Sequence, residues 1–139
     1  MAATQFTVRE AAALLGVSDD TVRRWADGGR LVLLAGQNGR AHVDGLELAG
    51  LAQELATESA LGEAFGTGRA SARNRITGIV TRVIKDGVMA QVELQAGPFR
   101  IVSLMSREAA DELELEPGTL ATASVKATTV VIELPEVGA

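Results

Sequence analysis

The hydrophobic pattern of this chain changes its period near the middle, and this change limits the folds that are open to it. Apolar residues recur at helical spacing in the first half, whereas from Arg75 onward they alternate with polar residues. Alternation places side chains on opposite faces of a strand, so the second half predicts a sheet with one buried face. Helices followed by strands within 139 residues indicate an α+β chain with two small domains.

Two short helices across a glycine-containing turn are predicted at the start of the chain. Thr7 and Glu10 have the spacing of a capping box, and Gly16 ends the helix that they open. Ser18 can cap a second helix over residues 19–26. The apolar faces are Ala11, Leu14 and Leu15 in the first helix, and Val22 and Trp25 in the second. This arrangement is typical of a helix-turn-helix.

A two-stranded hairpin, or wing, is predicted after these helices. An apolar strand over residues 31–34 leads to the turn 37–40, in which Asn38-Gly39 favours a tight hairpin. A return strand then passes through His42 and Val43. The sequence therefore predicts a winged helix-turn-helix.

The run from Phe6 to Leu46 is similar to the excisionase and MerR-type DNA-binding domains, whose second helix enters the major groove while the wing flanks it. The resemblance implies that the DNA-facing residues are Thr21, Arg23 and Arg24 in the second helix and Arg30, Arg40 and His42 in or beside the wing. Residues 1–45 carry five basic and five acidic side chains, so DNA affinity would depend on a few directed arginines. The alternative for Arg23 and Arg24 is a solvated helix face.

A third helix is predicted after the wing. Asp44 can cap it, and its apolar positions are Leu48, Leu51, Ala52 and Leu55, followed more weakly by Leu61, Ala64 and Phe65. This helix either pairs subunits or packs on the first domain. Glycines within residues 66–70 predict a joint. The expected domains are a winged helix-turn-helix over 1–45, a helix and linker over 46–68, and a barrel over 69–139.

Five short strands are predicted in the second half, over residues 76–83, 88–95, 99–105, 120–127 and 130–134. A short helix that Ser106 caps lies between the third and fourth strands. This order is that of a small closed barrel related to the OB-fold. The expected fold is thus a winged helix-turn-helix followed by a five-stranded OB-like barrel. Single-stranded nucleic acid is a poor alternative ligand, because Phe99 is the barrel's one aromatic residue.

Two short motifs at the ends of this β-rich segment indicate an anion site. Ser71-Ala72-Arg73-Asn74 stands at its head, and Lys126-Ala127-Thr128 stands near its end. Both combine hydroxyls, backbone amides and a cation, which are the groups that hold a small anion. The pair, with the alternation between them, resembles the molbindin family of molybdate- and tungstate-binding domains from Arg69 to Leu134.

The molbindin resemblance implies which residues bind the oxyanion. They are Ser71, Ala72, Arg73 and Asn74 from the first motif, Lys126, Ala127 and Thr128 from the second, and Ser106 at the start of the short helix. In that family the second motif commonly comes from a neighbouring subunit, so a homo-oligomer, either a dimer or a hexamer, is implied. A tetrahedral dianion has no proton to donate, so a site built from donors suits it better than protonated phosphate.

The expected function is a molybdate- or tungstate-responsive transcription regulator that binds double-stranded DNA through its first domain. The alternative is a storage or buffering protein for these oxyanions, whose first domain serves assembly. No enzyme is expected, because the chain has one histidine, no cysteine and no acids paired for acid–base catalysis. Neither a cofactor nor a metal cation is expected, since His42 has no second ligand at suitable spacing. Without a signal peptide or a long apolar run, the chain is expected in the cytoplasm and not at a membrane.

Overall fold

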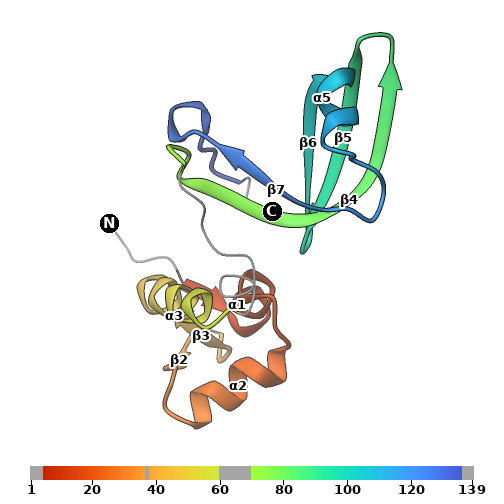
Figure 1. The fold of residues 1–139 in the computed structure, drawn as a ribbon. Coiled ribbons are helices and arrows are strands. Elements are labelled where there is room, and N and C mark those ends of the chain that lie inside the picture. The colour runs from red at the N-terminus through yellow and green to blue at the C-terminus, as the bar shows by residue number, and fades with distance from the viewer. Residues whose placement is uncertain (1–4, 37, 60–69, 136–139) are drawn as a thin grey trace. The chain divides into compact units, whose positions relative to one another are not determined.

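The computed structural model describes residues 5–36, 38–59 and 70–135. The chain divides into two compact units, Met1–Gly66 and Thr67–Ala139 (Figure 1). Some expected features lie outside the described residues: Gln37 in the hairpin turn, the helical continuation at Leu61, Ala64 and Phe65, and residues 66–69 of the joint.

The first unit is a small helical domain with a short three-stranded sheet. In chain order its described elements are β1 (Gln5–Thr7), α1 (Val8–Leu15), α2 (Asp19–Asp27), β2 (Leu34–Ala35), β3 (Ala41–Asp44) and α3 (Gly45–Thr57). β3 is the central strand and pairs antiparallel with both β1 and β2. The predicted helix-turn-helix is confirmed. The sequence does not predict β1, because a three-residue strand is too short to give a periodic signal.

Side-chain caps begin both helices of the helix-turn-helix. The Thr7 hydroxyl accepts a hydrogen bond from the Glu10 amide at 3.1 Å, and Glu10 Oε1 accepts one from the Thr7 amide at 3.2 Å. Gly16 ends α1 with a φ of 70°, a left-handed conformation that glycine adopts readily. Ser18 Oγ accepts a hydrogen bond from the Thr21 amide at 3.1 Å and caps α2. Local side-chain chemistry therefore sets these helix boundaries as predicted.

The capping box leads to a prediction about acid stability. Hydrogen bonds from the hydroxyl and the amide of Thr7, with a smaller effect of His42, hold the pKa of Glu10 below its ordinary value. A lowered pKa in the folded state means that this stabilisation is present above the ordinary glutamate pKa and is lost as pH falls through the lowered value. We expect Glu10→Gln to melt slightly below wild type at neutral pH, with the gap closing in acid. Paired thermal melts across pH check this, and a gap that stays constant with pH would contradict it.

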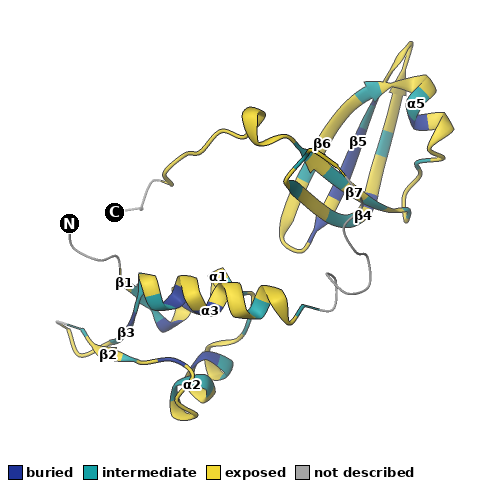
Figure 2. Ribbon diagram, turned by 60° about the vertical axis from the view of Figure 1, so that its left-hand side comes forward, coloured by how far each residue is buried: buried dark blue, intermediate teal, exposed yellow. Residues whose placement is uncertain are grey.

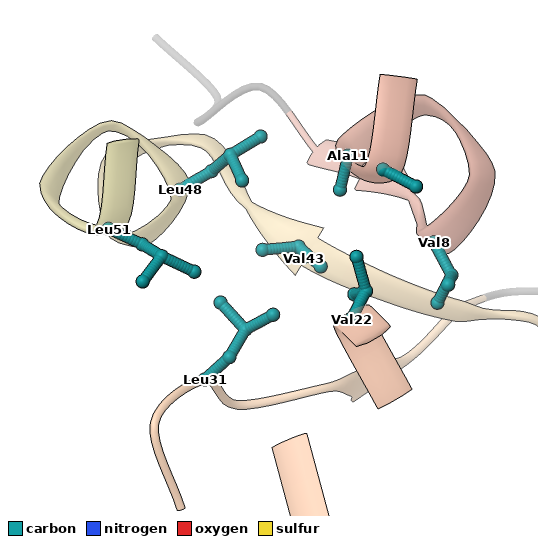
Figure 3. Close-up of a cluster of buried hydrophobic side chains, with 8 residues drawn as sticks. Val8, Ala11, Val22, Leu31, Val43, Leu48 and Leu51 are labelled. Carbon is teal, nitrogen blue, oxygen red and sulfur yellow. The ribbon is translucent and has the colours of Figure 1, made fainter. Parts of the chain in front are cut away.

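One apolar cluster holds the first unit together (Figure 3). Its buried members are Val8, Ala11, Ala12, Val22, Leu31, Val43, Leu48 and Leu51. Leu48 and Leu51 both come from α3. The third helix therefore packs on the helix-turn-helix, which is one of the two roles predicted for it.

Two residues predicted on apolar helix faces are exposed instead. Leu14 has 64% of its surface exposed, and Ala52 also faces solvent. In α1 the buried face follows Val8, Ala12 and Leu15, which have the i, i+4, i+7 spacing of a single helical stripe. Leu14 lies to one side of that stripe, so its prediction as a core residue is wrong.

The strand predicted over residues 31–34 is wrong in its extent. β2 consists of Leu34–Ala35 alone, which pairs with β3. Leu31 is buried in the core, with 1% of its surface exposed. The Val32 amide donates a hydrogen bond to Glu47 Oε1 of α3 at 2.8 Å rather than to a strand. The apolar run therefore reflects packing against α3 as well as strand pairing.

The second unit is a curled four-stranded sheet with one short helix in its described part (Figure 1). Its elements are β4 (Asn74–Asp86), β5 (Met89–Ala96), β6 (Phe99–Ser106), α5 (Arg107–Glu112), β7 (Leu120–Val125) and the 3-10 helix η1 (Ala127–Thr129). The strand order is β6-β5-β4-β7, and all neighbours are antiparallel. The helix lies between the third and fourth strands of this unit, as predicted.

β4 is long enough to pair with two different strands along its length. Residues 74–79 pair with β7, and residues 79–86 pair with β5. Near the crossover a Cβ on Gly78 would lie 2.4 Å from the Gln95 carbonyl oxygen, so the close approach of these strands requires glycine. The buried core of the unit is Val80, Val92 and Leu94.

The fifth strand, predicted over residues 130–134, is wrong for the single chain. The Thr129 amide and hydroxyl both donate to the Lys126 carbonyl, at 3.0 and 2.9 Å, and form a 3-10 turn after β7. β7 consequently ends at Val125, and the residues beyond the turn pair with no described strand. Figure 2 shows this segment as exposed, with exposed fractions of 81% for Val131, 83% for Ile132 and 91% for Leu134.

Candidate functional sites

The two motifs predicted to bind an anion meet at one end of the β4–β7 strand pair. Asn74, the last residue of the first motif, lies opposite Val125, the residue before the second motif. The Asn74 Nδ2 amide donates a hydrogen bond to the Val125 carbonyl at 3.1 Å. Strand pairing thus places side by side two motifs that are about fifty residues apart in the sequence.

The side chains of this strand end divide into positioning groups and free donors. The Asn74 amide is engaged with the backbone of β7, and Arg73 Nη1 donates to the Ala70 carbonyl at 3.5 Å. Ser71, Lys126 and Thr128 are exposed, and within the described residues their hydroxyls and ammonium make no hydrogen bond or ion pair. We call these three residues the donor cluster. Two hydroxyls and one ammonium are available there for an anion.

Three other cations of the second unit, Arg82, Lys85 and Arg100, are paired with carboxylates. Arg100 hydrogen-bonds the buried carboxylate of Glu93, and Arg82 lies 3.9 Å from the same group. Lys85 hydrogen-bonds Asp111 of α5, and this contact lowers the pKa of that carboxyl. The donor cluster therefore offers an anion an unpaired cation, whereas these three side chains are already paired with carboxylates.

Ser106 lies at the opposite end of the sheet. β4 runs from Asn74 to Asp86, and Asp86 pairs with Met89, which in turn pairs with Ser106. The Ser106 hydroxyl caps α5 by accepting a hydrogen bond from the Ala109 amide at 3.0 Å. A single chain therefore does not bring Ser106 to the donor cluster.

In the first unit, three arginines from three different elements line one groove. Arg9 comes from α1, Arg23 from α2 and Arg40 from the hairpin, around a cavity of about 500 Å³. The other lining residues are Thr7, Val8, Asp19, Gly39 and Ala41. Sequence reasoning identified Arg23 and Arg40 but missed Arg9. The available signal was its place next to the capping box, in the first turn of α1.

Thr21 and Arg24 form a second polar group on α2. Arg24 Nη2 donates to Thr21 Oγ1 at 3.2 Å, and the hydroxyls of Thr21 and Ser18 lie 2.9 Å apart. Both arginines predicted on this helix, Arg23 and Arg24, are exposed. His42 is half-buried, and its Nδ1 lies 2.8 Å from the Arg40 carbonyl oxygen, so it supports the backbone of the hairpin.

Arg30 is engaged inside its own unit. Its Nη2 lies 2.9 Å from Glu58 Oε1 and 3.9 Å from Glu54 Oε2, and its guanidinium is 5.4 Å from the centre of the Trp25 ring. Trp25 is partly buried against the apolar cluster. These contacts connect the end of α2 to α3 and leave Arg30 outside the arginine groove.

These sites define a class of protein: a ligand-binding β-sheet domain joined to a helix-turn-helix domain. A TOBE domain matches residues 70–132, and a helix-turn-helix domain matches residues 6–43. The chain is 40% identical to Molybdenum-pterin-binding protein 3 of Clostridium pasteurianum over 63 residues, which are 93% of that protein and 45% of this chain. The chain belongs to this family of TOBE-domain proteins, and the resemblance stated from sequence is confirmed.

One further relative and one solved structure are also similar to part of this chain. Molybdenum-pterin-binding protein MopA of Rhodobacter capsulatus is 39% identical over 69 residues, which are 49% of this chain and 26% of MopA. The chain thus spans about a quarter of that protein. A solved structure of a molybdate binding protein from Sporomusa ovata is 28% identical with a TM-score of 0.47, covering 48% of this chain and 100% of that one.

The matched families are binding domains rather than enzymes. Within the described residues, no helix has the length and apolar character that a bilayer-crossing segment requires.

Proposed function

We propose that this chain is a cytoplasmic transcription regulator that responds to molybdate or tungstate. The observation that carries the proposal is the meeting of the two motifs at the β4–β7 end, with the donor cluster unpaired. The same chain contains a helix-turn-helix domain with exposed arginines. The names of two relatives, which specify molybdenum-pterin binding, support a molybdenum-containing ligand.

The donor cluster has the chemistry that a tetrahedral metal oxyanion requires. Molybdate and tungstate are dianions without protons, so each oxygen accepts hydrogen bonds and none donates. Hydroxyls, amides and an ammonium are all donors toward such an ion. Protonated phosphate would leave its own hydrogen without an acceptor, and sulfate has the same charge in a smaller volume. Because the charges are equal, this site would distinguish molybdate and tungstate from sulfate by the size of its cavity.

The site is complete only when chains assemble, so the proposed protein is a homo-oligomer. One chain presents the donor cluster on its surface, and its Ser106 lies at the far end of the sheet. Several large apolar side chains of the second unit are also exposed, among them Phe99, Leu104, Val131, Ile132 and Leu134. Contact between copies would bury such surface and would bring Ser106 of one copy to the donor cluster of another.

A ligand between subunits can control DNA binding through the geometry of the assembly. Dimeric helix-turn-helix proteins bind two half-sites at a fixed spacing. If the oxyanion favours one arrangement of subunits, it changes the spacing of the DNA-binding units. The coupling is reciprocal, because DNA of the matching spacing then raises oxyanion affinity by the same factor.

Fluorescence anisotropy with a DNA duplex tests the regulator. The duplex is selected from a randomised library on the wild-type protein, with molybdate present in one selection and omitted from a parallel one. We expect molybdate to change the affinity for the selected duplex at least fivefold, the lower range of such couplings, whereas sulfate at equal ionic strength leaves it unchanged. Equal affinities with and without molybdate would reject the sensing role.

A triple variant separates the regulator from a storage protein. Replacing Arg23, Arg24 and Arg40 with alanine removes exposed cations of the first unit without touching the second. We expect the variant to lose binding of the selected duplex and to retain its calorimetric heat with molybdate. Retained DNA binding would contradict this assignment, and failure to select any duplex would favour the storage function.

A further inference from the structure

The arginine groove differs from an ordinary charged surface because the three arginines that line it have no ion-pair partners among the described residues. Arg9, Arg23 and Arg40 make no ion pair or side-chain hydrogen bond within the described part of the chain. By contrast, Arg24 contacts Thr21 and Arg30 contacts two glutamates. Three unpaired arginines that line one cavity give it an excess of positive charge, which favours an anion there.

The shape of the groove restricts what that anion is. The cavity lies between the first turn of α1, the first half of α2 and the hairpin turn, and the backbone at Gly39 forms part of its wall. Guanidinium groups bind phosphate oxygens bidentately through their planar forks. A groove that borders both α2 and the hairpin suits the backbone of a duplex whose major groove receives α2.

Asp19 places one negative charge in the same groove. It lies in the first turn of α2, where a carboxylate interacts favourably with the positive end of the helix dipole. A carboxylate beside a bound phosphate repels it, so Asp19 offsets part of the attraction from the three arginines. Asp19 therefore lowers the affinity of the groove for the phosphates of every duplex. Tight binding then depends on additional contacts, such as those to bases, that only the correct DNA sequence supplies.

We infer that the groove of Arg9, Arg23 and Arg40 clamps a backbone phosphate of duplex DNA, that Arg9 is a DNA-contacting residue, and that Asp19 weakens this clamp. The inference deepens the proposed function and rests on DNA binding by the first unit. It also assigns Arg30 to the packing of α3 rather than to DNA.

A salt titration of the full chain with the selected duplex tests the clamp. Removing one phosphate contact lowers the slope of log affinity against log salt by about 1, and removing a charge-assisted hydrogen bond costs about tenfold in affinity. We expect both effects for Arg9→Ala and a several-fold gain in affinity for Asp19→Asn. Arg75→Ala is the matched control, because Arg75 is exposed in the second unit and its removal changes net charge equally. Thermal melts confirm that each variant is folded.

A double variant shows whether two arginines hold the same phosphate. If Arg9 and Arg40 share it, the loss in Arg9→Ala/Arg40→Ala is smaller than the product of the two single losses. If the double variant's loss of affinity equals the product of the two single losses, the two arginines do not share a phosphate. If the wild type binds the duplex and Arg9→Ala has the same affinity and salt slope as Arg75→Ala, Arg9 does not contact DNA. The proposed function would then remain intact.

Two further outcomes count against the inference. If the wild-type protein binds no duplex, both the proposed function and the clamp fail. If inorganic phosphate raises the melting temperature of the wild type but not of Arg9→Ala, and Arg9→Ala binds DNA normally, the groove holds the free anion instead. Chloride at equal ionic strength is the control for that comparison.

Discussion

Replacing Ser71 and Lys126 together with alanine is expected to abolish molybdate and tungstate binding. Lys126 carries the one ammonium of the donor cluster, and Ser71 contributes a hydroxyl from the segment just before β4. Hydrogen bonds to a charged group contribute about 1.5–3 kcal/mol each. Losing two of them weakens binding by roughly a hundredfold or more, which titration calorimetry with each oxyanion measures directly.

The strand pair itself supplies a matched control for this variant. Arg75 and Ser124 lie opposite each other on β4 and β7, one step further from the strand end than the Asn74–Val125 pair. Arg75→Ala/Ser124→Ala therefore removes a cation and a hydroxyl from the same two strands. We expect this control to bind molybdate as wild type does. Undiminished heat from the Ser71/Lys126 variant, or equal loss in both variants, would show that the oxyanion binds elsewhere.

Features that depend on neighbouring residues in the chain were predictable from the sequence. The Thr7–Glu10 capping box, the Ser18 cap and the Gly16 terminus each form from groups within a few residues, so their geometry follows from local spacing. The same holds for the alternation that produces β5, whose odd and even positions face opposite sides of the sheet.

Features that depend on distant partners were not predictable in the same way. The Val32 amide donates a hydrogen bond to Glu47 of α3, and no sequence pattern near residue 32 predicts this contact. Arg30 resembles a DNA-contacting arginine in sequence, but Glu58 and Trp25 engage it in the folded unit. Arg9 is the converse case, because it lines the arginine groove only when α2 and the hairpin fold beside it.

The proposed oxyanion site was partly predictable for a related reason. Alternation predicts strands, and the resemblance implies that the two motifs act together, but the register that joins Asn74 to Val125 is a property of the folded sheet. Ser106 is a residue that the single chain leaves apart from the donor cluster. A site shared between copies cannot be completed from one sequence, because the symmetry that joins the copies is not encoded in any local pattern.

The exposed segment at residues 130–134 is expected to hold the oligomer together. Val130, Ile132 and Leu134 alternate with Val131 and Glu133, so an extended segment has one wholly apolar face. Within the described sheet, β6 and β7 each have one neighbouring strand and therefore one open edge. An apolar cavity of about 300 Å³ in the same unit is lined by residues of both strands, including Ile101, Met105 and Ala123. A second copy can place its segment in this cavity and pair with an open edge.

Ile132→Asp is therefore expected to convert the oligomer into a monomer and to remove molybdate binding with it. Placing a carboxylate in an apolar contact without a partner costs several kcal/mol, which strongly disfavours this contact between subunits. Because Ile132 is 83% exposed in the single chain, the substitution should leave the fold of the monomer intact. Light scattering measures the mass, and circular dichroism confirms the sheet.

Glu133→Gln provides the control, since it changes the neighbouring residue on the opposite face of the same segment. This variant should keep both the wild-type mass and the oxyanion heat. An Ile132→Asp protein that remains oligomeric would place the subunit contact on another surface. A monomer that still binds molybdate with wild-type affinity would show that Ser106 of a second copy is not needed, and that the donor cluster of one chain is sufficient for the ion.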